Sequence, residues 1–383
     1  MSNTQKKNVP ELRFPGFEGE WEEKKLEGII KVNSGKDYKH LDKGDIPVYG
    51  TGGYMTSVSE PLSEIDAVGI GRKGTINKPY LLEAPFWTVD TLFYCTPKKE
   101  TDILFILSLF RKINWKVYDE STGVPSLSKQ TINKINRFVP TNKEQQKIGK
   151  FFSKLDRQIE LEEQKLELLQ QQKKGYMQKI FSQELRFKDE NGNDYPKWEE
   201  KKLGEIIILQ NGFAFESSIF TKKGIPIIRI TDINNSLVSA GTVYYPKNIN
   251  IDDRFKIKKN DILMAMSGAT AGKVGKYISD NPSLLNQRIA KFEMKYGTNS
   301  QFIFAYLNTK IFQQELTKLL VAGAQPNISS RDVEKISLTL PFHLEQQKIG
   351  ALNKKMDYLI EKQQFKIKNL NLRKRWLLQK LFI

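Results

Sequence analysis

The hexapeptide EQQKIG occurs twice in this 383-residue sequence, at positions 144–149 and again at 345–350. The match extends beyond these six residues: at the same separation of 201 positions (345 − 144), Asp156 matches Asp357, and apolar residues follow at equal intervals in both segments. An internal repeat of this kind indicates a repeated structural unit. The chain is therefore predicted to fold as two similar halves.

The two halves also correspond upstream of the hexapeptide, although less closely. The tetrapeptide ELRF begins at Glu11 and again at Glu184, a separation of 173 positions, whereas the matching prolines Pro125 and Pro326 are 201 positions apart. The second copy has therefore gained about 28 residues (201 − 173) ahead of its hexapeptide. A constant length after the hexapeptide and a variable part before it are expected of a fixed scaffold that carries variable binding domains.

A long amphipathic helix is predicted after each hexapeptide, because apolar residues recur at steps of four and three positions, as in the seam of a coiled coil. In the first copy these residues are Ile148, Phe152, Leu155, Ile159, Leu166, Leu169, Tyr176 and Ile180. In the second copy they are Ile349, Leu352, Met356, Ile360, Ile367, Leu370, Leu377 and Leu381. Polar residues interrupt both patterns at matching places: Glu162 and Lys173 in the first, Gln363 and Lys374 in the second.

Each of these helices needs a partner for its apolar side, because a single amphipathic helix is marginally stable in water. The simplest arrangement pairs the two helices of one chain antiparallel, with a globular domain near each end. A homodimeric coiled coil is the alternative. A helix over residues 144–181 would be roughly 57 Å long at 1.5 Å per residue.

The rest of the sequence predicts mixed strands, turns and helices. Strands are expected where short runs rich in β-branched and aromatic residues are bounded by Gly, Pro or Asn, at 46–50, 67–71, 91–95, 225–230, 261–266 and 288–294. Helices are expected at 104–113 and 301–320. Because strands and helices do not alternate regularly, the predicted fold class is α+β. The predicted domains are two similar globular domains, 1–140 and 184–341, each followed by a spacer helix within 141–183 or 342–383.

The charge balance favours a polyanionic partner. The formal net charge is +17 and the pI is about 9.5, so nucleic acid is the first candidate, although a lysine-rich protein without such a partner would have the same balance. No apolar run reaches the roughly 18 residues that cross a bilayer, and the opening residues lack the hydrophobic stretch of a signal peptide, so a cytoplasmic location is expected. The single cysteine, Cys95, lies in an apolar segment and is expected to be an inert core residue.

Motifs for catalysis within the chain fail on spacing or composition. The segment SGATAGKVGK has three residues between Gly268 and Gly272 where a phosphate-binding loop needs four, and Val274 replaces the Ser or Thr that would hold magnesium. An amino-methyltransferase would be expected to carry an Asn/Asp-Pro-Pro-Tyr/Phe loop, which neither NKPY nor NPSL matches. Two histidines and one cysteine cannot form a metal cluster of nitrogen and sulfur ligands.

Glycine-rich turns at equivalent places in both copies, GRKGT (71–75) and SGATAGK (267–273), suit contact with a nucleic-acid backbone through amides and cationic side chains. In the major groove, Arg can pair with guanine and Asn or Gln with adenine. The candidate DNA-binding residues are Arg72, Lys73, Thr75, Asn77, Arg229, Thr231, Ser267, Thr270, Lys273, Gln287, Arg288, Gln325 and Asn327. Each one alone is better explained as a solvated loop residue, so the prediction rests on the set.

Two divergent globular parts, each ending in a P-x-x-x-EQQKIG turn at Pro140 or Pro341 and followed by a long seam helix, closely resemble the DNA-specificity subunit of type I restriction-modification systems. The resemblance covers nearly the whole chain, 11–382. Its most specific features are the two hexapeptides, the segments GDIPVYGTGG and IGRKGT, and the PSLS and PNIS segments that begin at Pro125 and Pro326.

The resemblance implies that each globular domain is a target recognition domain that reads one half of a split, asymmetric DNA site. It implies that the helices act as a spacer and as the docking surface for two modification subunits. The residues expected to serve helix pairing and docking are Ile148, Phe152, Leu155, Ile159, Leu166, Leu169, Ile349, Met356, Ile360, Ile367, Leu370 and Leu377.

It further implies that the modification subunits bring S-adenosylmethionine for adenine methylation, and that restriction subunits bring ATP and Mg for translocation and cleavage. This chain would then be non-catalytic and would bind no cofactor or metal itself. Two other functions stay open on the residues alone: a self-contained adenine methyltransferase, and a coiled-coil scaffold that binds DNA without sequence preference.

Overall fold

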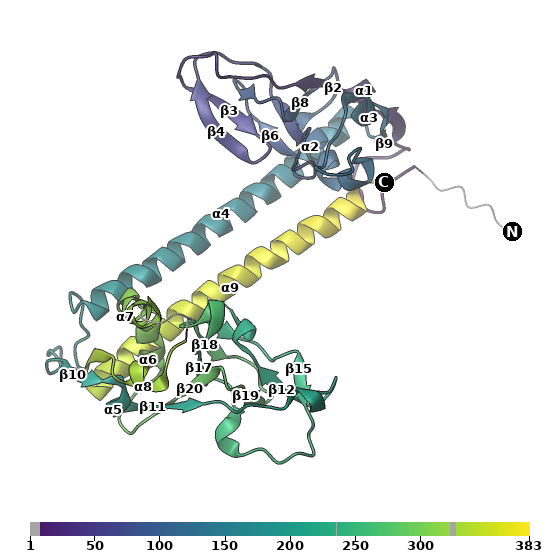
Figure 1. Cartoon of the computed structure of the whole chain (residues 1–383). Helices are drawn as coiled ribbons and strands as arrows, with labels where there is room; N and C mark the ends of the chain where they lie inside the picture. The colour runs from purple at the N-terminus through teal and green to yellow at the C-terminus, as the bar shows by residue number, and fades with distance from the viewer. Residues whose placement is uncertain (1–7, 235, 322–326) are drawn as a thin grey trace. The chain divides into compact units, whose positions relative to one another are not determined.

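The structure is a computed structural model that describes residues 8–234, 236–321 and 327–383. It divides into two compact units (Figure 1). Unit 1 comprises the chain up to Lys165 together with Gln363–Ile383, and unit 2 comprises Leu166–Lys362. The two long helices, α4 (Asn142–Phe181) and α9 (His343–Leu381), each contribute to both units.

The described part of unit 1 contains three sheets, which are antiparallel or mixed. The first has the order β2 (Ile30–Ser34), β8 (Leu92–Pro97), β5 (Ala67–Gly71), β6 (Tyr80–Leu82) and is antiparallel throughout. The second has the order β4 (Gly53–Val58), β3 (Ile46–Gly50), β7 (Trp87–Thr88), and β3 and β7 run parallel. The third pairs β1 (Glu22–Lys25) with β9 (Asn136–Val139). The helices are α1 (Leu26–Ile29), α2 (Ile103–Lys112), α3 (Lys129–Lys134) and the 3₁₀ turn η1 (Trp115–Tyr118).

Unit 2 has the same arrangement of sheets with additional strands. Its first sheet begins with the same order of strands, β11 (Ile207–Asn211), β20 (Ile289–Met294), β17 (Ile262–Ala265), β18 (Val274–Tyr277), and adds β14 (Leu237–Val238) and β13 (Ile233–Asn234). The second has the order β15 (Val243–Tyr245), β12 (Ile225–Ile228), β19 (Ser283–Leu285), β16 (Lys256–Ile257), with β12 and β19 parallel. The third pairs β10 (Glu199–Lys202) with β21 (Ser337–Leu340). The helices are α5 (Leu203–Ile206), α6 (Ser300–Leu307), α7 (Lys310–Val321) and α8 (Ser330–Glu334), and the 3₁₀ turns are η2 (Ser217–Ile219), η3 (Ile230–Asp232), η4 (Asp253–Phe255) and η5 (Gly268–Thr270).

The shared frame confirms the predicted α+β class with two similar globular parts. In the sequence, the added strands β13, β14 and β16 lie between strands that have counterparts in unit 1, which is where the second copy is longer; in the sheets, β14 and β13 extend one edge of the first sheet and β16 forms one edge of the second. Predicted strands are found at β3, β5, β8, β17 and β20, and Cys95 is fully buried in β8, where burial raises the pKa of its thiol. Among the described helices, none has the length and apolar composition needed to cross a bilayer.

Two predicted elements end earlier than the sequence suggested. The single helix expected at 301–320 is wrong, because α6 stops at Leu307 and α7 starts at Lys310. Between them the Asn308 side chain donates to the Phe304 carbonyl at 2.8 Å, and the Thr309 hydroxyl accepts from the Phe312 amide at 3.3 Å. Such side-chain bonds to the backbone favour helix ends. The strand expected at 225–230 likewise ends at Ile228, and η3 begins two residues later.

The first residue of the repeated hexapeptide forms a buried ion pair with the other repeated motif, ELRF. In unit 1 the Arg13 guanidinium donates two bonds to the Glu144 carboxylate, at 2.8 and 2.7 Å, and the Glu144 side chain is only 1% exposed. In unit 2 Arg186 holds Glu345 in the same way, at 3.2 and 2.7 Å. A paired guanidinium with two parallel bonds offsets the cost of burying a carboxylate. The two short motifs are thus halves of one contact, made once in each unit.

The second residue of the hexapeptide joins the long helix to the short helix beside it. The Gln145 side chain accepts from the Asp102 amide at 3.0 Å and donates to the Pro140 carbonyl at 2.9 Å. Gln346 makes the equivalent bonds in unit 2, to the Asn299 amide and the Pro341 carbonyl, both at 2.9 Å. These bonds fix the start of each long helix against the N-terminus of α2 or α6.

The final glycine of the hexapeptide is required by close packing. A Cβ atom on Gly149 would lie 2.5 Å from Asp102 Oδ1 and 2.7 Å from the Phe105 amide nitrogen, and one on Gly350 would lie 2.7 Å from Asn299 Oδ1. No side chain fits at these distances. The hexapeptide therefore occurs twice because each globular part is attached to its long helix by the same contacts.

In unit 1 the first part of α4 packs antiparallel against the last part of α9. Ile148, Phe152, Leu155 and Ile159 share one hydrophobic core with four residues at the end of the chain, Leu377, Leu378, Leu381 and Phe382. The Phe382 ring stacks on Phe105 of α2, with ring centroids 5.6 Å apart. The predicted antiparallel pairing within one chain is confirmed.

The polar residues that interrupt the predicted seams bind to groups on the opposite helix. In unit 1 Gln363 donates to the Glu162 carboxylate at 2.7 Å, and Lys374 pairs with Asp156. In unit 2 Lys173 pairs with Asp357. The two lysine–aspartate pairs are equivalent in the repeat, since the two lysines are 201 positions apart and so are the two aspartates. The described seam residues Leu166, Leu169, Ile360, Ile367 and Leu370 are half-buried, whereas Ile349 and Met356 are buried.

Candidate nucleic-acid interface

The glycine-rich turn of unit 1 presents two cations on a fixed backbone. After β5 ends at Gly71, the Arg72 amide donates to the Thr91 carbonyl at 2.8 Å, the Gly74 amide donates to the Pro125 carbonyl at 2.8 Å, and the Arg72 carbonyl accepts from Leu127 at 2.9 Å. Gly74 has a φ of +85°, which glycine adopts without strain. The turn is thus held by the segment that begins at Pro125, and the side chains of Arg72 and Lys73 are exposed.

Unit 2 builds its glycine-rich turn in the same way. Ser267 forms a β-bridge with Asn327, as Lys73 does with Ser126, and Ser126 and Asn327 are equivalent in the repeat. Gly268 and Gly272 have φ values of +77° and +83°. The turn leads through η5 into strand β18, whereas a phosphate-binding loop leads into a helix. In each unit the glycine-rich turn therefore lies beside the PSLS or PNIS segment, next to one candidate surface.

A cluster of buried polar groups without partners marks the unit 2 turn. Arg229 Nε, Ser267 Oγ and Thr270 Oγ1 have no hydrogen-bond partner among the described residues. Arg229 Nε lies 3.9 Å from Asp232 Oδ2, too far for a hydrogen bond, although the Arg229 Nη2 atom donates to Thr242 Oγ1 at 3.2 Å. The η3 turn that follows Arg229 packs against η5, where Gly268 would bring a Cβ within 3.2 Å of Ile230.

Such groups have chemical consequences for the surface. A buried polar atom without a partner costs about 1–3 kcal/mol, and a bound ligand that supplies the missing partner recovers that cost. Base edges in the major groove offer both donors and acceptors. Because these three atoms are buried, a base can pair with them only if the turn rearranges on binding, whereas the Arg229 side chain as a whole is 44% exposed.

The other candidate residues of unit 2 are linked to this cluster through the backbone. The Met266 amide donates to the Arg288 carbonyl at 2.8 Å, and the Lys273 amide donates to the Thr270 carbonyl at 3.0 Å. The side chains of Thr231, Lys273, Gln287, Arg288 and Asn327 are exposed. In unit 1 Thr75 is half-buried and Asn77 is exposed. Gln325 lies outside the described residues. Contact of any of these residues with DNA stays a prediction.

Unit 2 also has a basic hollow that the sequence did not predict. It has a volume of about 700 Å³ and is lined by Lys222, Lys223, Gly224, Tyr244 and Lys247, among others. Lys222 and Lys223 precede β12, and Arg229 follows it. The signal in the sequence was the run TKKGIP ahead of a predicted strand; Lys247, which follows β15, could not be assigned to the same hollow without the fold.

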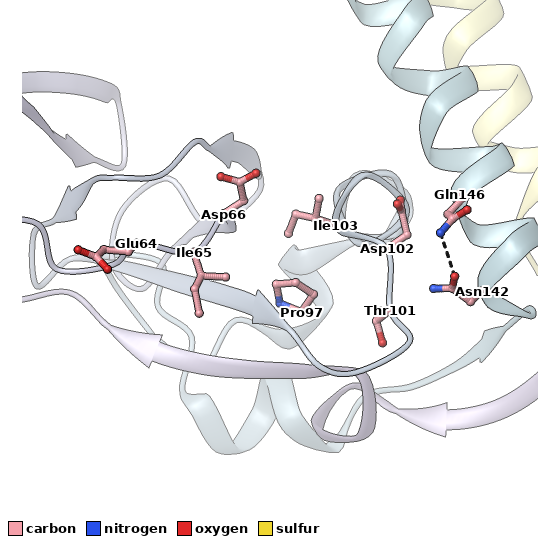
Figure 2. A pocket seen from close by; sticks show the side chains of 9 residues that line it. All are labelled: Glu64, Ile65, Asp66, Pro97, Thr101, Asp102, Ile103, Asn142 and Gln146. Carbon is pink, nitrogen blue, oxygen red and sulfur yellow. Dashed lines mark hydrogen bonds between the residues drawn. The ribbon is translucent and has the colours of Figure 1, made fainter.

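An acidic hollow in unit 1 has the opposite character (Figure 2). Its volume is about 530 Å³, and its lining includes the carboxylates Glu64, Asp66 and Asp102 beside Asn142 and Gln146 at the start of α4. Figure 2 shows the Gln146 amide bonded to Asn142, at 3.0 Å. Three carboxylates repel phosphate, so this hollow lies outside the candidate DNA surface. Within the described ranges no three His, Cys, Asp or Glu side chains gather closely enough to hold a metal ion.

Comparison with protein families agrees with the class that the sequence resembles. A family model described as type I restriction modification DNA specificity domain matches residues 18–171 and again residues 195–371. The chain therefore belongs to this family and carries two copies of its DNA-recognition domain. The family predicted from the sequence is confirmed.

Individual relatives carry the same description. The chain is 30% identical over 316 residues to the type I restriction enzyme MjaVIII specificity subunit of Methanocaldococcus jannaschii, which covers 78% of this chain and 71% of that protein. It is also 30% identical over 171 residues to the type I restriction enzyme EcoAI specificity subunit of Escherichia coli, 43% of this chain and 28% of that protein. A type I restriction-modification S subunit from M. genitalium has the same fold, with a TM-score of 0.69 and 16% identity over 98% of this chain and 99% of that one.

Proposed function

We propose that this chain confers DNA sequence specificity on a type I restriction-modification complex, and that its two recognition domains read different halves of one asymmetric, bipartite site. The observation that supports this most directly is that the two units share their sheets but differ in the side chains of their glycine-rich turns. Both units share the sheet order and the hexapeptide contacts, whereas the turns at equivalent places expose Arg72 and Lys73 in one unit and Lys273 in the other. Different side chains on one frame would read different bases.

In this proposal the long helices serve two purposes. They hold the recognition domains, taken as 1–140 and 184–341, at a set spacing, and they dock two modification subunits through residues along the seam helices. Methylation of adenine with S-adenosylmethionine, and ATP- and Mg-dependent translocation and cleavage, would reside in the modification and restriction subunits. The chain itself would be non-catalytic, which agrees with the lack of a methyltransferase loop in its sequence and with the names of its relatives as specificity subunits.

Co-expression with a candidate modification subunit, followed by genome-wide mapping of methylated adenines, tests this function. The expected result is methylation at a single site made of two unlike half-sites separated by bases of any identity. A palindromic site would contradict the assignment of one reader to each half. Methylation by the isolated chain with a labelled methyl donor would instead identify a self-contained methyltransferase.

A second experiment assigns the half-sites to the units. Replacing Arg229 and Ser267 by alanine removes two of the unpartnered polar groups of unit 2 and should change or abolish recognition of one half-site only. The matched change in unit 1, Arg72→Ala with Lys73→Ala, should affect the other half-site. If either double variant altered both half-sites together, the units would not be independent readers.

A further inference from the structure

The β3–β4 hairpin of unit 1 exposes two large side chains next to each other. Tyr54 is 64% exposed and Met55 is 53% exposed. Both lie just after the two-residue loop 51–52 that joins the strands, and β4 forms one edge of its sheet. Single exposed apolar residues are ordinary, whereas neighbouring ones indicate a contact surface. These two residues are here named the hairpin tip.

The backbone of the hairpin directs the Met55 side chain. In the register of β3 and β4 the pairing passes from Tyr54 directly to Thr56, so Met55 is an extra residue without a partner strand residue. A β-bulge of this kind bends a strand and re-aims a side chain. A Cβ atom on Gly50 would lie only 2.6 Å from Met55 Sδ, so the glycine leaves the space that the Met55 side chain occupies.

Two further tyrosines support Tyr54. Its ring packs edge-on against Tyr49, with ring centroids 6.4 Å apart, and Tyr49 packs against Tyr80 at 6.1 Å. The Tyr80 hydroxyl donates to the Gly50 carbonyl at 2.6 Å, and the hydroxyls of Tyr54 and Ser57 are bonded at 3.1 Å. Tyr54 is therefore held in position although it is exposed, and its ordering on binding costs little conformational entropy.

The hairpin tip and the glycine-rich turn at Arg72 are attached to the same short loop between β7 and β8. This loop is tight, because the Leu92 amide donates to the Val89 carbonyl at 3.0 Å. The Val89 amide donates to the Tyr49 carbonyl of β3 at 3.0 Å, and the Thr91 carbonyl accepts from the Arg72 amide at 2.8 Å. The exposed apolar pair and the exposed cations are thus linked through three residues, 89–91.

The equivalent region of unit 2 is built differently. Strand β12 is the counterpart of β3, since both contain an Ile-Pro step and pair in parallel with β19 or β7. After β12 the chain forms η3, β13 and β14 before it returns as β15, which pairs with β12. In unit 1 the chain returns at once as β4. A ligand of the hairpin tip would therefore be bound by unit 1 and not by the same element of unit 2.

We propose that Tyr54 and Met55 are specificity-determining residues of unit 1 that contact thymine methyl groups in the major groove. The proposal rests on the function proposed above, in which unit 1 reads one half-site. The major groove is about 12 Å wide and admits a two-stranded ribbon such as β3–β4. Thymine presents its 5-methyl group there, and apolar side chains contact it, while Arg72 and Lys73 neutralise phosphates beside it.

Other ligands fit the hairpin tip less well. The minor groove is about 6 Å wide, which is narrow for two strands that carry a tyrosine and a methionine side by side. A partner protein with an apolar surface would leave the exposed cations Arg72 and Lys73 without counterparts. Duplex DNA supplies a methyl group and phosphates together, so the combination of side chains favours DNA.

Uracil in place of thymine removes only the 5-methyl group and tests the contact directly. The full-length chain with its modification subunit is titrated with fluorescent duplexes that contain the methylated site, each with one thymine replaced by uracil, and binding is followed by anisotropy. In the half-site that the Arg72 and Lys73 variant identifies, one or two replacements should weaken binding, each about fourfold, as expected for one buried methyl-sized group.

Variants of the hairpin tip assign the effect. Tyr54→Ser with Met55→Ser should bind the thymine and uracil duplexes equally at those positions, with an unchanged dependence on salt, because no charge is removed. Tyr54→Phe with Met55→Leu keeps the apolar contact and should still discriminate. Ile65→Ser, at a 60% exposed residue that lines the acidic hollow of the same unit, should discriminate as the parent chain does.

The proposal is overturned if the serine variant distinguishes thymine from uracil as well as the parent chain does. It is equally overturned if no thymine of that half-site responds to replacement, or if the half-site contains no thymine. These outcomes leave the specificity function intact, because the methylated bipartite site is established before the replacements are made. Absence of such a site would instead refute the proposed function.

Discussion

The side chain of Gln363 bonds to Glu162, the residue that occupies the same place in the other copy of the repeat. Gln363 Nε2 donates to the Glu162 carboxylate at 2.7 Å and to the Glu162 carbonyl at 2.8 Å. Lys366 also pairs with this carboxylate, and together the two bonds lower the pKa of Glu162. In an antiparallel pair of equivalent segments, a position meets its own equivalent only at the centre of the pair. A polar pair there specifies the register of the seam, as a single polar residue does in a coiled coil.

Removing the arginine of the buried ion pair should destabilise unit 1 more than unit 2. Arg13→Ala leaves the Glu144 carboxylate buried without its cation, which costs about 3–5 kcal/mol. Arg186→Ala should cost less, because Trp198 Nε1 still donates to Glu345 at 3.0 Å, whereas Trp21 Nε1 has no partner among the described residues. Hydrogen exchange measured by mass spectrometry on peptides of each unit provides the comparison.

The control for this pair is Arg157→Ala, which removes an exposed ion pair with Glu160 and should change stability by less than about 1 kcal/mol. Equal losses of stability in Arg13→Ala and Arg186→Ala would show that Trp198 does not support the carboxylate.

Adding a methyl group at the final glycine of the hexapeptide should loosen the attachment of the globular part. The new Cβ of Gly149→Ala would lie 2.5 Å from Asp102 Oδ1 and 2.7 Å from a backbone nitrogen, and overpacking of this kind costs about 1–3 kcal/mol. Gly175→Ala, in the same helix but with no atom within 4 Å of the new Cβ, should instead raise the free energy of unfolding by roughly 0.5–1 kcal/mol. Urea titration of both variants is decisive, and a stabilised Gly149→Ala would refute the close packing.

The sequence predicted the parts of this fold that depend on local pattern. The strand at 46–50 and both long helices follow from residue spacing, and each was found close to its expected bounds. The break between α6 and α7 was not predictable, because apolar residues continue at helical spacing across it, and only the side-chain bonds of Asn308 and Thr309 end the helix. The repeated motifs ELRF and EQQKIG were both visible in the sequence, yet nothing there indicated that Arg13 pairs with Glu144, which is 131 positions away.

For the candidate site too, the sequence indicated the features that depend on local pattern and not those that depend on packing. Glycine-rich basic turns are a local signal, so the sequence indicated the turn at Arg72, which the PSLS segment holds in place; its contact with DNA stays a prediction. The lysines of the basic hollow in unit 2 come from separate loops. Ser267 Oγ and Thr270 Oγ1 have no hydrogen-bond partner among the described residues, and this depends on the packing of η3 against η5. Properties that arise from three-dimensional packing have no signature in residue spacing.

Alanine in place of both exposed cations of the unit 1 turn should weaken DNA binding and flatten its dependence on salt. If Arg72 and Lys73 each neutralise a phosphate, the slope of log K against log salt should become shallower by about 0.9 for each phosphate that the variant leaves unneutralised. Lys99→Ala with Lys116→Ala removes two exposed lysines of the same unit that lie outside the turn and should leave the slope nearly unchanged. An unchanged slope in the Arg72 and Lys73 variant would exclude both from the phosphate surface.

The stability of unit 2 should rise with pH between about 8 and 10 because of Lys276. Its ammonium donates to Gln301 at 2.6 Å and lies 4.1 Å from the centre of the Phe304 ring, and burial lowers its pKa from 10.5 to about 8. In this window the unfolded chain binds the proton more tightly than the folded chain, so the free energy of unfolding increases as pH rises. Below about pH 8 both states are protonated and the dependence disappears.

Lys276→Met should remove this rise, and Lys247→Met, at an exposed lysine of the same unit, should retain it. Urea unfolding at several pH values across the window measures the difference. A rise of the same size in Lys276→Met would assign the effect to other groups.

The spacing of the two recognition domains is tested most directly by lengthening both helices near their central polar pair. Seven residues inserted after Gln164 and seven after Ile360, one heptad in each helix at the same level of the pair, keep Glu162 beside Gln363 and the seam pattern and add roughly 10 Å of helix, close to three base pairs of duplex. With a cognate modification subunit present, mapping of methylated adenines should show both half-sites unchanged and the gap between them longer by about three base pairs. Altered half-sites, or an unchanged gap in a fully folded variant, would contradict the role of the helices as a spacer.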